Sequence, residues 1–165
     1  QTLLPDTPDD LRAAIVDSYR QAFMSGRIQS EAPLYPGARD CLDALARRDD
    51  LLLGIATGKS RRGLDAMLDH HDLRGRFVTL QTADNHPSKP HPAMLLAACD
   101  EAGVAPAASV MVGDTVFDLD MARAAGMAGI GVEWGYHPAD SLRQRGMAVA
   151  GDFGDLQKML EEWST

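Results

Sequence analysis

The sequence predicts an α/β fold with a mostly parallel sheet and helices on both of its faces. From residue 37 onward, short continuous apolar runs alternate with amphipathic stretches of helical length. Continuous apolar runs bounded by polar residues are typical of buried parallel strands. Regular alternation of strands and helices favours right-handed crossovers between parallel neighbours. This alternation predicts a Rossmann-like fold, and the length of 165 residues fits one ordinary domain.

The elements follow from apolar spacing and from the residues that interrupt it. A first helix is expected over 8–25, where apolar residues recur at near-helical spacing, and Gly26 ends it. A loop with two prolines leads to a second amphipathic helix over 37–48. The remaining elements are strands at 51–57, 76–82, 109–114 and 128–134, helices at 60–70, 93–103, 118–126 and 138–145, a short stretch at 147–150, and a last helix ending near Trp163.

Composition excludes several classes of protein. A net charge of −8, from 16 basic and 24 acidic residues, argues against a nucleic-acid partner, which requires a basic face. No apolar run approaches the roughly 18 residues that cross a bilayer, so no membrane partner is expected. Cys41 and Cys99 each lie in a helical apolar pattern outside any metal-binding spacing. They are expected to be buried thiols of a cytoplasmic protein.

Ligands of parallel sheets bind outside the carboxyl ends of the strands. The first of the expected strands ends at Thr57, followed by Gly58. A threonine hydroxyl and the free N–H groups of a helix start bind anions, and glycine allows close backbone approach. Thr57 is therefore a candidate phosphate ligand, although simple capping of the next helix would also explain it.

The loop after the second of these strands holds Lys89 in "SKPHP". Pro90 and Pro92 stiffen the backbone on either side of it. A lysine held there is a candidate clamp for a phosphate, whereas a loop lysine without partners would simply be solvated.

Two carboxylates follow the third of these strands. Asp114 ends the strand and Asp118 lies one helical turn further on, so both side chains face the ligand edge. Oxygen donors in this arrangement suit Mg²⁺, which takes one or two protein carboxylates together with waters and substrate oxygens. The alternative is an acidic first turn that the helix dipole favours. Asp120 lies off the face of Asp118 and is expected to be solvated.

These three segments occur in a characteristic order. "GIATGKS", "SKPHP" and "GDTVFDLDMARAAG" resemble the second, third and fourth motifs of the haloacid dehalogenase superfamily of phosphohydrolases. "GIGVEWGYH" is similar to its phosphoglycolate phosphatase-like branch, and the resemblance covers roughly 34–160. It implies that Thr57 and Lys89 are catalytic, that Thr57, Gly58 and Lys89 bind phosphate, and that Asp114 and Asp118 form the Mg²⁺ site.

The resemblance also implies that the chain has two parts and that it lacks the family's first motif. Residues 1–33 would be the remnant of a helical cap, and residues 34–165 the α/β core. The family's first motif, DxDx[TV]G, supplies a nucleophilic Asp and an acid/base Asp, but "DTPDD" at 6–10 has the wrong spacing. Because the strand before that motif lies in the middle of the family's sheet, an upstream segment or another chain is expected to complete it.

The implied function is a Mg²⁺-dependent phosphatase that hydrolyses a small phosphate monoester similar to phosphoglycolate. The reaction would pass through an aspartyl-phosphate whose Asp lies upstream, so this chain alone is expected to be inactive. Alternatives are a phosphomutase or dehalogenase of the same superfamily, or a non-catalytic phosphate-binding domain. A dehalogenase would not need the metal pair.

Overall fold

The computed structural model describes residues 33–164. From Tyr35 onward the chain forms one compact unit. The helix expected over 8–25 lies outside the described residues, as does almost all of the predicted cap segment 1–33.

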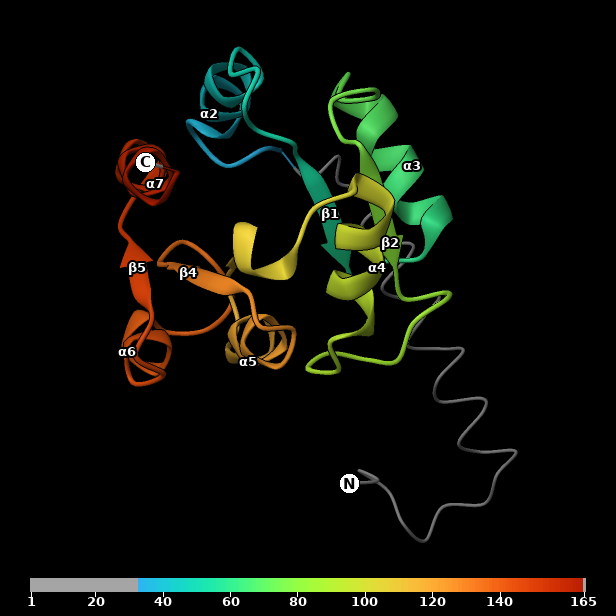
Figure 1. Cartoon of the computed structure of the whole chain (residues 1–165). Coiled ribbons are helices and arrows are strands. Elements are labelled where there is room, and N and C mark those ends of the chain that lie inside the picture. Colours follow the sequence, from blue (N-terminus) through green and yellow to red (C-terminus); the bar gives the residue numbers. More distant parts are fainter. Residues whose placement is uncertain (1–32, 165) are drawn as a thin grey trace, which may run out of the picture. The chain divides into compact units, whose positions relative to one another are not determined.

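Helices and strands alternate along the described chain, as Figure 1 shows. The strands are β1 (Gly54–Thr57), β2 (Thr79–Thr82), β3 (Val110–Gly113), β4 (Ala128–Val132) and β5 (Ala148–Ala150). The helices are α2 (Ala38–Leu45), α3 (Arg61–His70), α4 (Ala93–Ala102), α5 (Val116–Ala124), α6 (Ala139–Arg143) and α7 (Phe153–Trp163), with a 3₁₀ turn η1 at Pro106–Ala108. The predicted α/β class is confirmed.

The strands form two parallel sheets. One contains β1 and β2, with Gly54 opposite Thr79, and the other has the order β3-β4-β5. In the second sheet Val110 lies opposite Ala128, and Ile130 lies opposite Ala148. No ladder joins β1 to β3 within residues 33–164, so each of these strands has one edge without a strand partner in the described chain.

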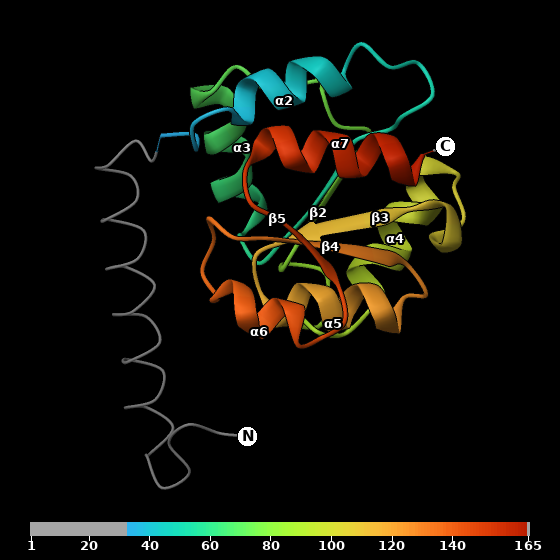
Figure 2. The same cartoon turned by 90° about the vertical axis from the view of Figure 1, so that its left-hand side faces the viewer.

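Helices cover both faces of the strands. Figure 2 shows α2 and α7 on one side and α5 and α6 on the other. The first core cluster lies between α2, α7 and the sheet and consists of Cys41, Leu45, Ile130, Val132, Ala150, Leu156 and Leu160. The second cluster lies under α4 and α5, and Ala56 of β1 and Met111 of β3 both pack against it. This second cluster therefore links the two sheets.

The burial of a strand depends on whether it has a neighbouring strand on both sides. Ile130, Gly131 and Val132 of β4 are buried, because β4 has a strand on each side. In contrast, the apolar residues of β1 and β3 are only half-buried, and Leu52 just before β1 is 55% exposed. The apolar runs that predicted central strands are thus only partly covered in the described chain.

Several predicted boundaries differ from the structure. β1 begins at Gly54 rather than at residue 51, and β2 begins at Thr79 rather than at residue 76. The apolar Leu51 and Leu53 pack against the first core cluster without belonging to the ladder. The helix expected over 118–126 begins at Val116, because Thr115 caps it.

Candidate functional site

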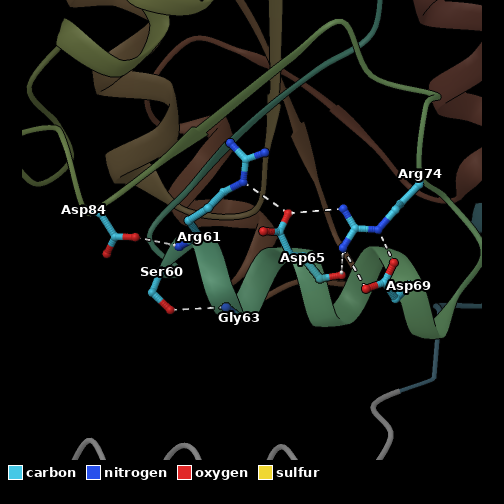
Figure 3. Close-up of polar contacts among 7 residues, drawn as sticks. All are labelled: Ser60, Arg61, Gly63, Asp65, Asp69, Arg74 and Asp84. Carbon is cyan, nitrogen blue, oxygen red and sulfur yellow. Dashed lines mark hydrogen bonds and ion pairs between the residues drawn. The ribbon is translucent and has the colours of Figure 1, made fainter.

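Thr57 is the last residue of β1 and is half-buried. Its Oγ1 accepts a hydrogen bond from Lys59 N at 3.2 Å. Helix α3 is capped by Ser60, whose Oγ accepts from Gly63 N at 3.2 Å (Figure 3). The interpretation of Thr57 as the cap of this helix is therefore wrong, because Ser60 has that role.

The loop after β2 is attached to the loop after β1. Asp84 Oδ2 accepts a hydrogen bond from Arg61 N, the first residue of α3, at 2.7 Å (Figure 3). Ala83 N also donates to Lys59 O at 3.1 Å. Asp84 thus satisfies an N–H donor at the start of α3, which is therefore not free to bind an anion. Sequence reasoning missed Asp84, because a single acid in a loop has no periodic signal.

The outer face of α3 carries an ion-pair network. Arg61 contacts Asp65 at 3.1 Å, and Arg74 contacts both Asp65, at 3.6 Å, and Asp69 (Figure 3). Both arginine side chains are more than half exposed. Exposed pairs of this kind contribute little stability and keep Arg61 along its own helix.

Lys89 connects the two sheets. Its Nζ donates to Asp118 Oδ1 at 2.6 Å and to the carbonyl of Ala56 in β1 at 3.2 Å. The lysine side chain is 22% exposed, so it is not simply a solvated loop lysine. Strand β1 and the segments that follow β2 and β3 therefore meet at Lys89.

The position of Lys89 relative to β1 follows from the ladder. In parallel strands, alternate residues direct their N–H and C=O groups to opposite sides. Leu53 O and Lys59 O both accept hydrogen bonds from the β2 side, so the carbonyl of Ala56 faces the other edge. Lys89 Nζ therefore lies at the edge of β1 that has no strand partner in the described chain.

Asp118 is buried and fully engaged. Its Oδ2 accepts from Thr115 N at 3.0 Å and from Thr115 Oγ1 at 2.7 Å, while Oδ1 accepts from Lys89. Thr115 Oγ1 in turn accepts from Asp118 N, which completes a capping box. A Cβ on Gly113 would lie 2.3 Å from Asp118 Cβ, so only glycine allows this close packing.

Asp114 follows β3 and is half-buried. Its Oδ2 accepts from Tyr136 N at 2.9 Å, and its backbone carbonyl accepts from His137 N at 3.1 Å. Within residues 33–164, no hydrogen-bond donor engages Asp114 Oδ1. One carboxylate oxygen at this edge is therefore open to a ligand.

The donor set fits part of a Mg²⁺ site. Among the described residues there is no group of three or more His, Cys, Asp or Glu that could hold a metal ion. Mg²⁺ needs only one or two protein carboxylates, since waters and substrate oxygens complete its shell. Asp114 has an oxygen for this purpose, whereas both oxygens of Asp118 have protein donors. The metal assignment of the two residues stays a prediction.

Several other polar residues are engaged locally. Asp120 is half-buried and accepts from Arg145 at 2.8 and 2.9 Å, so it is paired and not simply solvated. His86 pairs with Gln81 Oε1 at 2.8 Å, and His91 Nδ1 accepts from the backbone N–H of residue 93 at 3.2 Å. These histidines therefore support the loop that carries Lys89.

The cysteines are buried, as expected. Both Cys41 and Cys99 are free thiols with about 5% exposure. Burial raises the pKa of the Cys41 thiol, which disfavours the reactive thiolate.

Two further features lie outside the candidate site. A pocket of about 140 Å³ between α3 and β2 is lined by Leu68, Arg74, Gly75, Phe77 and Leu80. None of these is a predicted site residue. In the part of the chain that the structure describes, no helix has the length and apolar character needed to cross a membrane.

The fold and the site together define a Rossmann-like α/β domain with its polar residues at the carboxyl ends of the strands. A family model described as haloacid dehalogenase-like hydrolase matches residues 3–126. The chain belongs to this family, as the order of its segments predicted.

Curated relatives and a solved structure agree with the family. The chain is 38% identical over 147 residues to a "Probable phosphatase IndB" of Dickeya dadantii, covering 87% of this chain and 63% of the relative. It is 32% identical to a phosphoglycolate phosphatase of Synechococcus elongatus, covering 80% of this chain and 64% of the relative. The crystal structure of a hydrolase from Pseudomonas syringae superposes with a TM-score of 0.82 at 25% identity, covering 96% of this chain and 73% of that one. The chain thus spans slightly under two thirds of the length of these two curated relatives.

Proposed function

We propose that this chain is part of a Mg²⁺-dependent phosphatase that hydrolyses a small phosphate monoester similar to phosphoglycolate. The observation that carries the proposal is the position of Lys89, whose ammonium contacts both Ala56 O and Asp118 Oδ1. It places a positive charge between the segments that carry Thr57 and Asp114. The phosphatase names of two relatives support the same conclusion.

The phosphate would bind at the carboxyl end of β1. Thr57 Oγ1, the backbone N–H of Gly58 and Lys89 Nζ are suitable donors for phosphoryl oxygens. Gly58 is exposed, and a Cβ built on it would meet no atom of residues 33–164 within 4 Å, so the space beside it in this part of the chain is open to a ligand. Lys89 would neutralise charge on the transferring group, while Asp118 holds its ammonium in place.

Asp114 would hold Mg²⁺ through its open carboxylate oxygen, and Asp118 would support the site by fixing Lys89 and the start of α5. When bound, the metal neutralises charge on the phosphate oxygens and orients them. Oxygen ligands of this kind are the ones that Mg²⁺ prefers.

The nucleophile is proposed to lie in an upstream strand. Its first Asp would attack phosphorus while the second Asp of the same motif protonates the leaving oxygen, which releases the alcohol of the substrate, and water would then hydrolyse the aspartyl-phosphate. The edges of β1 and β3 without strand partners in the described chain support insertion of a strand between them, from upstream or from another chain. The proposed partner in the reaction is a small phosphorylated metabolite, and the buried free thiols support a cytoplasmic location.

The test is phosphate release by the intact natural protein from p-nitrophenyl phosphate and from phosphoglycolate. Activity is expected with Mg²⁺ and not with EDTA, and Asp114→Ala is expected to remove it. Asp100→Ala, an exposed aspartate on α4, is the matched control and should keep full activity. Robust hydrolysis in EDTA would overturn the proposal.

The same assay separates the alternatives. A phosphomutase would return a phosphorylated isomer of a sugar phosphate in place of inorganic phosphate. A non-catalytic phosphate-binding domain would bind phosphate without turning over any monoester. Chloride release from a haloacid without Mg²⁺ would identify a dehalogenase.

A further inference from the structure

The segment Gly135–His137 is separated from the end of β4 by two residues. It has no role in the function proposed above. We propose that this segment, called the Asp114 clamp below, positions Asp114 for metal binding, with His137 as its positioning side chain. The inference rests on the proposed function, because it concerns the same metal site.

Two consecutive backbone amides hold Asp114. Tyr136 N donates to Asp114 Oδ2 at 2.9 Å, and His137 N donates to the Asp114 carbonyl at 3.1 Å. One bond fixes the side chain and the other fixes the backbone of the same residue. Because Oδ2 is already engaged, Oδ1 is the oxygen that remains for a ligand.

Gly135 allows the clamp to come this close. A Cβ on Gly135 would lie 2.0 Å from Asp114 Cβ and 2.7 Å from Asp114 Oδ2. The Cβ of Asp114 is fixed to its backbone, so rotation of the aspartate side chain cannot relieve this overlap. Any other residue at this position would therefore displace the clamp or Asp114.

The His137 ring holds the next part of the chain. Its Nδ1 accepts a hydrogen bond from Val116 N, at the start of α5, at 3.1 Å. An accepting Nδ1 requires the neutral ring with its proton on Nε2. The ring also lies beside Phe117, with 5.7 Å between the centroids. The His137 ring thus contacts Val116 and Phe117, while the backbone amide of His137 donates to Asp114 itself.

The clamp and the capping box act on the same short segment from two directions. Thr115 is hydrogen-bonded to Asp118, and its neighbours Asp114 and Val116 are hydrogen-bonded to the clamp. Every residue at this turn is therefore fixed before a ligand arrives. Groups that orient a metal ligand in this way typically change metal affinity or activity 10- to 100-fold when they are mutated.

The experiment measures Mn²⁺ binding to the intact natural protein, by electron paramagnetic resonance of the free ion. His137→Ala is expected to weaken Mn²⁺ binding about 10-fold. His137→Asn places an amide oxygen near the position of Nδ1 and should restore affinity close to that of the unchanged protein. His137→Gln carries its oxygen one carbon further and should not.

Gly135→Ala is expected to weaken Mn²⁺ binding at least as much as His137→Ala. Gly151→Ala is its matched control, since Gly151 also follows a strand and, among the described residues, a Cβ there would meet only Asp155 Oδ2, at 4.0 Å. Circular dichroism establishes which variants fold. If Gly135→Ala does not fold, the comparison of His137→Ala with His137→Asn still decides.

The outcomes separate this inference from the proposed function. If Asp114→Ala binds Mn²⁺ as tightly as the unchanged protein, the metal assignment itself is wrong. If Asp114→Ala loses binding but folded His137→Ala keeps it, the clamp is wrong and the proposed function stands. Equal losses for His137→Ala and His137→Asn would also contradict the clamp, because the Nδ1 acceptor would then not matter.

Discussion

Lys89 Nζ lies 2.6 Å from Asp118 Oδ1, and the Asp118 side chain is only 4% exposed. The two residues are 29 positions apart and belong to segments that follow strands of different sheets. Their ion pair therefore fixes one half of the candidate site to the other.

Lys89→Met is expected to lower the free energy of unfolding by about 2 kcal/mol, because it leaves a buried carboxylate oxygen without its donor. Urea unfolding measures the change. Lys89→Met combined with Asp118→Asn should lose less than the sum of the two single substitutions, since the neutral amide no longer needs the ammonium. Strict additivity would show that the pair does not stabilise the fold.

Gly113→Ala is expected to be strongly destabilising. The new methyl group would lie 2.3 Å from Asp118 Cβ, and overpacking of a tight site costs about 1–3 kcal/mol. Gly63→Ala in α3 is the comparison, because its Cβ would meet Ser60 Oγ at 3.4 Å and alanine favours a helix. In thermal unfolding, the melting temperature should fall strongly for Gly113→Ala and should not fall for Gly63→Ala.

Asp84→Ala is expected to cost about 1 kcal/mol, as the loss of a capping acceptor usually does. The affected bond is the one from Arg61 N, so hydrogen exchange at that amide should accelerate. Asp84→Asn keeps an acceptor oxygen and should lose less. Asp100→Ala, an exposed helical aspartate, is the control and should leave the exchange of Arg61 unchanged.

The Asp43–Arg76 pair predicts a dependence of stability on pH. The hydrogen bond from Arg76 holds the pKa of the Asp43 carboxyl below its ordinary value. A carboxyl whose pKa is lower in the folded state stabilises the fold at pH values above its unfolded pKa of about 3.9. This stabilisation disappears as the pH falls through the folded-state pKa.

The check is the melting temperature of the unchanged chain and of Arg76→Gln as a function of pH. The difference between them should be present at pH 7 and should vanish at strongly acidic pH. Arg62→Gln, at an exposed position in α3, should show a difference that does not change with pH. A pH-independent difference for Arg76→Gln would contradict the prediction.

Much of the fold was predictable because its signals are local. Apolar runs such as "LLLGIAT" and the alternation with amphipathic stretches indicate parallel strands and helices. The ends of those runs predicted that Thr57, Asp114 and the loop that carries Lys89 lie at the carboxyl ends of the strands. The strand limits were less accurate, because Leu51 and Leu53 are apolar through core packing rather than through strand pairing.

The parts of the site that depend on distant contacts were not predictable. The pairing of Lys89 with Asp118, the attachment of Asp84 to Arg61 and the contact of His137 with Val116 each join separate elements. Asp84 and His137 lie in loops, where neither spacing nor residue type indicates a partner. Only the folded arrangement identifies these contacts.

The cluster that links the two sheets is rich in sulfur. Four of the eight methionines in the chain belong to it or pack against it, namely Met94, Met111, Met121 and Met127. Unbranched thioether side chains adapt their shape to irregular spaces more readily than branched ones do. The contact between the sheets is therefore tolerant of small displacements of one sheet against the other. Conversion of these side chains to sulfoxides would introduce polar groups where the two sheets meet.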